Sequence, residues 1–544
     1  MFETYPDDLG ILRLYADQSA FLGMKYNVGS KEDMKNSEVY LLNAVGANEK
    51  IYQLDQDTKK ENLAYAYSNI ARLYLDMGAK KKSESQNYYQ KSLKMFEEIA
   101  ENEPSMVNNE NLAMAYNDIA NLYSTGDRQD IVNAQFYYKK SIAIIKKLLD
   151  EHENITLKKT LALAYINIAS LYFSENNFSK AEKWYYRSID VIRQIEQIEP
   201  SLENKETLAK AYNNIADLFA SELIDDRQKA EDFYFKAMRI FESILNHKPI
   251  LSVKRSLSVT YDNMGNLYAD WKIDQAYKYY KKAIEIKEDL LSISSSKDDI
   301  TDLATSYNNL GFLYMDNRSD DNFALECYKK TIDLMHTIDE NEMDKSYGEN
   351  LATCYTNLAS LYFLLDDIAN SEIYFKIAID IYKDLIEKYQ DDDIIEKLLI
   401  IYNNLACLYA DLDYSLEETE ELYLEVIELI KILKDPYKKR KKTAIAYNNL
   451  ANLYLIKDKN YALCEDCYLK SIELTKWVID YHKSIENEER LMVNYNNLAE
   501  LYAMWGKYKK AKEYLELAIK TADAIDYKNN QENINKFIYK HHEF

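Results

Sequence analysis

Apolar residues recur along this chain with the spacing of one helical face. The stretch from Leu208 to Phe219 reads LAKAYNNIADLF, with apolar positions at i, i+4, i+7, i+8 and i+11. That spacing forms the apolar stripe of an amphipathic α-helix. A second pattern, Ala-x-x-x-Tyr-x-x-Ser/Ala-Ile, is seen from Ala181 to Ile189, and its spacing is also helical. The two patterns together predict pairs of amphipathic helices.

These helix pairs are predicted to repeat along most of the chain. The tyrosine of the first pattern recurs ten times, with gaps of 45 to 49 residues. Its positions are Tyr67, Tyr116, Tyr165, Tyr212, Tyr261, Tyr307, Tyr355, Tyr402, Tyr447 and Tyr495. A fixed period of this length is typical of solenoids, in which each pair buries its apolar face against the next. The period therefore predicts an all-α solenoid with about 10–11 repeats of 45–49 residues.

The repeat resembles the tetratricopeptide repeat. The Trp-x-x-Leu-Gly-x-x-Tyr core of that family stands here as Tyr-x-x-Leu/Ile-Ala/Gly-x-x-Tyr, and alanine followed by an aromatic residue stands in the second helix. The family repeat has about 34 residues, so these longer units imply longer helices. They are similar to the repeats of kinesin light chains, which have a comparable Asn-Asn-Leu-Ala string. The resemblance implies a right-handed superhelical solenoid of antiparallel helix pairs, with the first helices along the concave surface.

The two ends of the chain depart from the repeat, as terminal units of solenoids commonly do. We expect residues 1–60 to form a degenerate repeat or N-terminal cap, and residues 61–522 to form ten tandem repeats. We expect residues 523–544 to form a tail or a C-terminal capping helix. Four residues near the N-terminus match the first-helix pattern in part: Ile11, Tyr15, Ser19 and Leu22.

An asparagine stands two residues after the repeated tyrosine. At about 100° per residue it lies about 240° around the helix from the motif leucine, away from the core stripe. Asparagine is about 0.6 kcal/mol less favourable in a helix than alanine, so its recurrence suggests a role outside the core. Asp118 replaces it in one repeat. The members are Asn69, Asn167, Asn214, Asn263, Asn309, Asn357, Asn404, Asn449 and Asn497.

Two interpretations of these asparagines remain open. A carboxamide offers two N–H donors and an acceptor, which suits it to holding the backbone of an extended peptide. Peptide-binding tetratricopeptide proteins have such groove asparagines, so the resemblance implies the same use here. Alternatively, each asparagine bonds a helix of the adjacent repeat, or was inherited from a duplicated ancestral unit.

Carboxylates share the predicted groove face with the asparagines. They predict an acidic groove that accepts a neutral-to-basic segment, although they could also be ordinary solvated charges. Only Arg72 and Lys210 occupy comparable positions, which disfavours a clamp for a terminal carboxylate. The acidic candidates are Asp76, Asp118, Asp217, Asp262, Asp270, Asp316 and Asp411.

Composition narrows the class of partner and the compartment. The 544 residues include only 10 glycines and 5 prolines, too few for a turn-rich β fold. The net charge of −23 disfavours binding to nucleic acid and to anionic membranes. No apolar run approaches the ~18 residues needed to cross a bilayer. Five cysteines fit a reducing compartment, so we expect a cytoplasmic location.

Candidate chemistry is sparse in this sequence. Cys464 and Cys467 have the spacing of half a zinc site, but no second pair accompanies them. Cys464 and Cys354 stand where other repeats have alanine, which favours a packing role. No phosphate-binding glycine loop is present. We therefore expect no enzymatic activity, no metal and no cofactor.

Together these features predict a protein–protein interaction scaffold or adaptor. Its partner would be another protein, held through an extended peptide segment in the asparagine-lined groove. One alternative is a structural scaffold that self-associates through its outer faces or terminal repeats. Another is a peptide-sensing regulatory protein that acts through a separate output partner.

Overall fold

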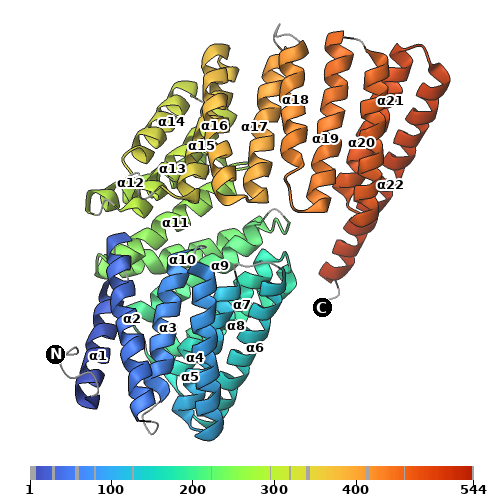
Figure 1. The fold of residues 1–544 in the computed structure, drawn as a ribbon. Coiled ribbons are helices and arrows are strands. Elements are labelled where there is room, and N and C mark those ends of the chain that lie inside the picture. The colour runs from blue at the N-terminus through green and yellow to red at the C-terminus, as the bar shows by residue number, and fades with distance from the viewer. Residues whose placement is uncertain are drawn as a thin grey trace. The chain divides into compact units, whose positions relative to one another are not determined.

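The regular elements of the described chain are helices arranged in antiparallel pairs (Figure 1). The computed structural model describes residues 8–26, 31–55, 60–78, 81–124, 128–221, 223–293, 296–317, 320–338, 343–411, 416–458 and 460–541. The predicted all-α solenoid of tetratricopeptide type is confirmed. The predicted boundaries at residues 60 and 522 stay predictions.

The chain divides into two compact units, Met1–Ile286 and Lys287–Phe544. Unit 1 contains α1 (Leu9–Tyr26), α2 (Lys31–Leu54), α3 (Lys60–Asp76), α4 (Lys82–Asn102), α5 (Met106–Tyr123), α6 (Arg128–Glu151), α7 (Ile155–Ser174), α8 (Phe178–Ile198), α9 (Leu202–Ala220), α10 (Arg227–His247) and α11 (Leu251–Tyr268). The unit boundary falls within α12 (Ile273–Ile293). Unit 2 continues with α13 (Lys297–Asp316), α14 (Asp321–Met335), α15 (Lys345–Leu364), α16 (Ile368–Tyr389), α17 (Asp392–Asp411), α18 (Leu416–Ile430), α19 (Pro436–Leu453), the π-helix η3 (Tyr454–Asp458), α20 (Tyr461–Tyr481), α21 (Ile485–Met504) and α22 (Tyr508–His541).

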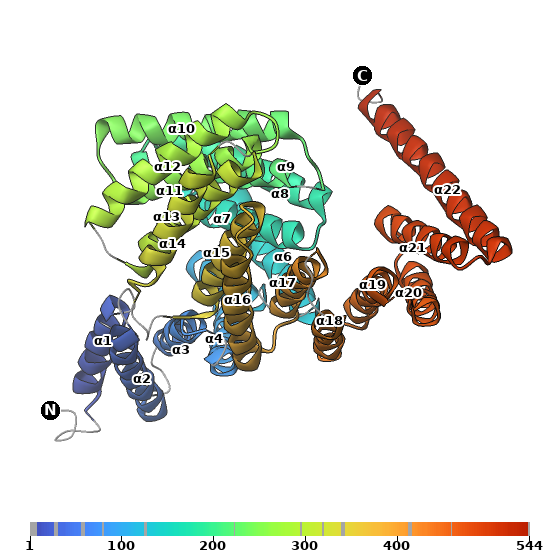
Figure 2. The same ribbon diagram turned by 90° about the horizontal axis from the view of Figure 1, so that it is seen from above.

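The odd-numbered helices from α3 to α21 contain the first pattern and are called first helices here; their partners are second helices. Within unit 1, α7 contacts both α5 and α9, and within unit 2, α15 contacts both α13 and α17. In these places consecutive first helices of one unit touch one another directly. α22 is longer than its partner α21 and extends past it (Figure 2).

Serine residues start several first helices. The Ser201 hydroxyl accepts the backbone N–H of Asn204 over 3.0 Å, which satisfies a free donor at the start of α9. The Asn204 side chain donates back to the carbonyl of Glu199 over 2.7 Å and ties the helix start to the preceding segment. The same arrangement occurs at Ser105 with Asn108, and at Ser484 with Asn487.

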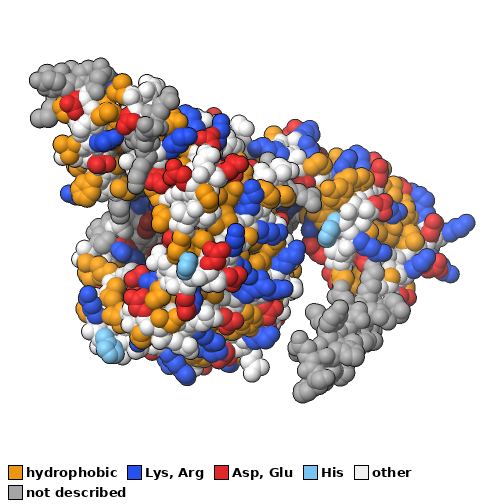
Figure 3. Space-filling model, turned by 90° about the horizontal axis from the view of Figure 1, so that it is seen from below, with side chains coloured by type: hydrophobic (Ala, Val, Ile, Leu, Met, Phe, Trp, Pro, Cys, Tyr) orange, Lys and Arg blue, Asp and Glu red, His pale blue; other side chains and the backbone are white. Residues whose placement is uncertain are grey.

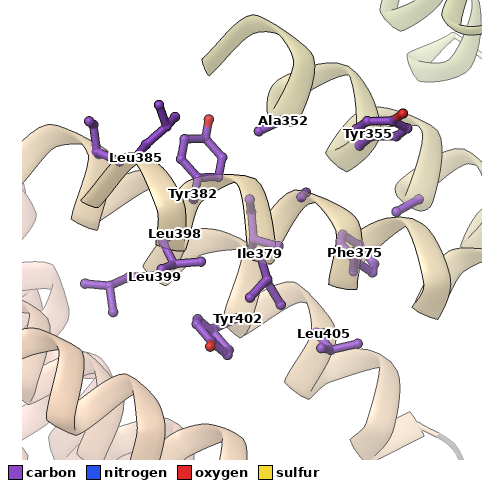
Figure 4. Packing of buried hydrophobic residues seen from close by; sticks show 14 of the residues in the cluster. Ala352, Tyr355, Phe375, Ile379, Tyr382, Leu385, Leu398, Leu399, Tyr402 and Leu405 are labelled. Carbon is purple, nitrogen blue, oxygen red and sulfur yellow. The ribbon is translucent and has the colours of Figure 1, made fainter. Parts of the chain in front are cut away.

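Aromatic and aliphatic side chains of three consecutive helices pack together in one core cluster of unit 2 (Figure 4). α16 contributes Phe375 and Ile379, and these pack with Tyr355 from α15 and with Leu398 and Tyr402 from α17. Burying one such side chain contributes about 1.5–3 kcal/mol. Each helix thus depends on the repeats beside it for stability.

Small residues allow close helix packing, as the sequence predicts. Cys354 and Cys464 are 0% exposed, in columns where other repeats have alanine. Both are free thiols. Residues 175–177 form the polar turn between α7 and α8, and Asn176 adopts a left-handed conformation there with φ of 57°. Asparagine tolerates that region better than most residues, so its place in the turn is explained.

Candidate functional site

The nine predicted asparagines all lie on first helices and are half-buried. The tyrosine and leucine positions around them are mostly buried, so the asparagines sit at the edge of the core. We call the face of the first helices that carries these nine side chains the asparagine face. Its members are Asn69, Asn167, Asn214, Asn263, Asn309, Asn357, Asn404, Asn449 and Asn497.

In unit 2, the paired asparagines link consecutive repeats. In each case the asparagine of the asparagine face donates to the side-chain carbonyl oxygen of the first asparagine of the Asn-Asn pair one repeat earlier. The distances are 3.2 Å from Asn357 to Asn308, 2.5 Å from Asn449 to Asn403 and 3.1 Å from Asn497 to Asn448. The doublet therefore works across a helix–helix contact, which explains why its helices tolerate a residue of modest propensity.

In unit 1, the acceptor lies one helical turn further along the preceding first helix. Asn167 donates to Asn121 over 3.1 Å, and Asn263 donates to Asp217 over 2.9 Å. A second-helix tyrosine donates to the same oxygen in each case, Tyr138 to Asn121 and Tyr234 to Asp217, both over 2.5 Å. Each acceptor thus joins a first helix, its second-helix partner and the next repeat.

Four members of the asparagine face make no hydrogen bond to another side chain in the described part of the chain. They are Asn69, Asn214, Asn309 and Asn404. For Asn214, the two corresponding positions in the preceding repeat are the apolar Ile166 and Ser170, whose hydroxyl lies 3.0 Å from the Tyr185 hydroxyl. For Asn404 the first of these positions is Thr356, whose hydroxyl donates to the carbonyl of Ala352. These amides therefore keep their hydrogen-bonding capacity.

A hydrogen bond to the adjacent repeat, as the second interpretation expects, is thus observed at five of the nine asparagines. Each such bond uses one N–H of the donating amide, and a carboxamide has two N–H donors and a carbonyl. The role in holding a peptide backbone stays a prediction. The four amides without an inter-repeat bond have the most hydrogen-bonding groups available for it.

The predicted acidic residues differ in their surroundings. Asp118 pairs with Arg72 over 3.2 Å; burial raises the pKa of its carboxyl, and Arg72 opposes that rise. Asp270 pairs with Arg227 over 3.5 Å. Asp76 and Asp262 also interact with neighbouring groups, and Asp316 is exposed. The side chain of Asp411 lies outside the described residues.

Asp217 combines burial with the absence of an ion pair, since no lysine or arginine of the described chain pairs with it. Burial raises the pKa of its carboxyl from 3.8 to about 6, although hydrogen bonds from Tyr234 and Asn263 oppose the rise. A cavity of about 330 Å³ opens beside it, lined also by Phe173 and Leu267.

Exposed apolar side chains accompany the asparagines, a feature that sequence reasoning missed. They stand four residues before the asparagine, or before Asp118 in the case of Met114, one helical turn away and on the same face. Their exposed fractions range from 41% to 55%. The sequence feature that could have revealed them is an apolar residue that recurs at one position outside the core stripe. We call these six residues the apolar column: Tyr65, Met114, Leu163, Val259, Ile400 and Val493.

The repeated tyrosines also have a structural role that the sequence did not reveal. Tyr261 donates its hydroxyl to Glu242 of the preceding second helix over 2.8 Å, and Tyr307 donates to Glu288 over 2.5 Å. Tyr116 and Glu97 form the same contact. The sequence feature that could have revealed this contact is a glutamate 19 residues before the tyrosine.

Charge on the surface is mixed despite the net charge of −23. On the face drawn in Figure 3, acidic and basic side chains are interspersed. In the described ranges, no three or more histidine, cysteine or carboxylate side chains are placed to hold a metal ion. No helix among the described residues is long and apolar enough to cross a membrane.

Three segments match the tetratricopeptide repeat family model: residues 162–194, 352–385 and 494–524. Each segment begins in a first helix and ends in its second-helix partner. The chain therefore contains tetratricopeptide repeats, and the predicted resemblance is confirmed. Such repeats generally mediate interactions between proteins, and the fold is usually non-catalytic.

Solved structures show distant likeness. BtubC (BKLC) from P. vanneervenii is 20% identical over 47% of this chain and 92% of its own, with a TM-score of 0.38. A signal transduction ATPase with numerous domains and a tetratricopeptide repeat sensor, from Pyrococcus horikoshii, is 14% identical over 86% of this chain and 64% of its own, with a TM-score of 0.45. A Rap protein complexed with competence and sporulation factor is 14% identical over 76% of this chain and 99% of its own, with a TM-score of 0.35. A search of curated proteins finds no match.

Proposed function

We propose that this protein is an interaction scaffold that binds an extended, neutral-to-basic segment of another protein along its asparagine face. The observation that supports this most is the set of amides without an inter-repeat bond, Asn69, Asn214, Asn309 and Asn404. An extended peptide presents backbone N–H and C=O groups along its length, and each amide can both donate and accept. Such contacts place little demand on the peptide's sequence.

The apolar column gives the proposed groove a second kind of contact. Leu163 and Ile400 are 53% and 55% exposed, each one turn from an asparagine of the asparagine face. Apolar side chains of the segment would gain about 25 cal/mol for each Å² buried against them. Binding would thus combine backbone hydrogen bonds from the amides with side-chain burial beside them.

Charge favours a neutral or basic segment over an acidic one. The net charge of −23 repels acidic chains and attracts basic ones at a distance. At close range, Asp217 offers a carboxylate without an ion-pair partner in the described chain. Most of the other acids on this face interact with neighbouring groups. The close-range preference for a basic residue would therefore be confined to the surroundings of Asp217.

The test uses peptides selected against the full chain from a random library of about 16 residues, which span up to roughly 55 Å when extended. The selected peptides are then titrated against the double variant Asn309→Ala, Asn404→Ala, in which both amides belong to unit 2. Losing two hydrogen bonds at about 1 kcal/mol each should weaken binding roughly 30-fold.

Because neither amide makes an inter-repeat bond, this variant should keep the stability of the parent protein. The matched control is Val132→Ser on α6, where Val132 is 52% exposed on a second helix. It should bind the peptides as the parent does. Unchanged binding by the double variant would overturn the proposed function.

A further inference from the structure

The surroundings of Asp217 have a neutral counterpart two repeats earlier. Tyr234 and Asn263 both donate to one Asp217 oxygen, over 2.5 and 2.9 Å. At the equivalent place, Tyr138 and Asn167 donate to the Asn121 oxygen over 2.5 and 3.1 Å. An amide therefore completes the same three-helix network without any charge.

The charge of Asp217 is thus unnecessary for holding the repeats together. Burial of an ionised carboxylate carries a free-energy cost, seen here as the raised pKa of Asp217. No lysine or arginine of the described chain offsets that cost. The second carboxylate oxygen makes no hydrogen bond within the described chain, and it is not sealed from solvent.

Among the described residues that line the cavity, Asp217 is the only charged one, and its second oxygen therefore gives the cavity an acidic group without a hydrogen-bond donor. The Asn266 oxygen already accepts the Tyr280 hydroxyl over 2.5 Å, and the Ser221 hydroxyl donates to the Leu218 carbonyl over 2.7 Å. The remaining wall includes the aromatic ring of Phe173 and the aliphatic Leu267. A carboxylate beside an aromatic ring suits a cation on an aliphatic stem.

We propose that this cavity is a subsite for one basic side chain, arginine or lysine, of the bound segment. The inference rests on the proposed function, because it assigns a position within the same peptide. The basic head group would pair with the free oxygen of Asp217. Its aliphatic stem would pack against Phe173 and Leu267, and Tyr234 and Asn263 would hold the carboxylate in place. The subsite would set one position of the segment, whereas the amides contact its backbone.

The experiment titrates the full chain with two capped nine-residue glycine–serine peptides by calorimetry. One has a central arginine, and the other has citrulline, the neutral analogue of nearly the same shape. We expect the arginine peptide to bind at least about tenfold more tightly, since one ion pair of this kind is worth about 1.5 kcal/mol or more. Asp217→Asn should bring the ratio to within about twofold, because the Asn121 network shows that an amide keeps the geometry.

Two further variants separate local from general charge effects. Asp232→Asn removes the same formal charge from a second-helix side chain that is 62% exposed, and it should leave the ratio unchanged. Asn121→Asp should add arginine preference at the neutral counterpart. Equal binding of both peptides by the parent protein would overturn the subsite while leaving the amide contacts intact. Equal affinity of Asp232→Asn for the arginine and citrulline peptides would also overturn the subsite.

Discussion

The Asn497 side chain donates an N–H to the carbonyl oxygen of Asn448 over 3.1 Å, and this bond joins α21 to α19. The two residues come from the same Asn-Asn string in consecutive repeats. The doublet therefore supplies both halves of a contact between repeats, one as donor and the other as acceptor. Asn449 and Asn403 form the same link between α19 and α17.

Asn497→Ala should loosen the contact between α19 and α21. One hydrogen bond of this kind contributes about 1 kcal/mol, so amide exchange in the two helices should quicken about fivefold. Hydrogen exchange with mass spectrometry measures this helix by helix. In Asn404→Ala, which removes no inter-repeat bond, exchange should stay as in the parent protein. Equal effects of the two variants would show that the bond contributes nothing.

Tyr261→Phe should weaken the junction between α10 and α11. The variant loses the bond to Glu242 and leaves that carboxylate without its donor, which costs about 1–3 kcal/mol. A double-mutant cycle with Glu242→Ala, read by exchange in the same helices, should give a coupling of about 1 kcal/mol. Additive effects of the two substitutions would contradict a direct interaction.

Asp217→Asn should stabilise unit 1 at neutral pH. The folded-state pKa is raised from 3.8 to about 6, so the folded protein binds this proton more tightly than the unfolded chain. Stability from this group is therefore present at low pH and is lost as pH rises from about 4 to about 6. Tyr234 and Tyr185 are the titratable groups of the described chain that interact with Asp217, and both stay neutral in this range.

The gain from Asp217→Asn should accordingly be about 1–3 kcal/mol at about pH 7.5 and should shrink toward pH 4. Hydrogen exchange of α9 to α11, corrected for the intrinsic effect of pH, measures it. A gain that is the same at both pH values would contradict the raised pKa.

Ile400→Ser should reduce peptide affinity without reducing stability. The side chain is 55% exposed, and surface substitutions of this kind usually change stability by less than about 0.5 kcal/mol. Titration with the selected peptides should show binding weakened about fivefold, since roughly 1 kcal/mol of apolar burial is lost. If Leu163→Ser and Ile400→Ser both bind as the parent does, the apolar column has no part in recognition.

Much of the fold could be predicted because each helix has a clear apolar stripe and the repeat is regular. Tyr212 and its counterparts marked the period, and the small residues at Cys354 and Cys464 were correctly expected to be buried. The resemblance to the tetratricopeptide repeat added the pairing of the helices. The division into two units left no comparable mark in the sequence.

The site could be predicted only in part. The sequence places the asparagines away from the core stripe, since position around a helix follows from sequence alone, and the structure has them half-buried at the edge of the core. Their acceptors could not be predicted, because these depend on how adjacent helices slide against each other. Asn449 reaches Asn403, whereas Asn263 reaches Asp217, one turn further along its helix. The charge state of Asp217 also depends on burial, which the sequence does not give.

Photocrosslinking tests the binding surface most directly. A selected peptide with a photoreactive leucine at several positions in turn is irradiated with the full chain, and the adducts are located by mass spectrometry. The account predicts adducts on first helices, at or beside the asparagine face, with successive peptide positions labelling successive repeats. Adducts confined to second helices, or to a single repeat for every peptide position, would contradict it.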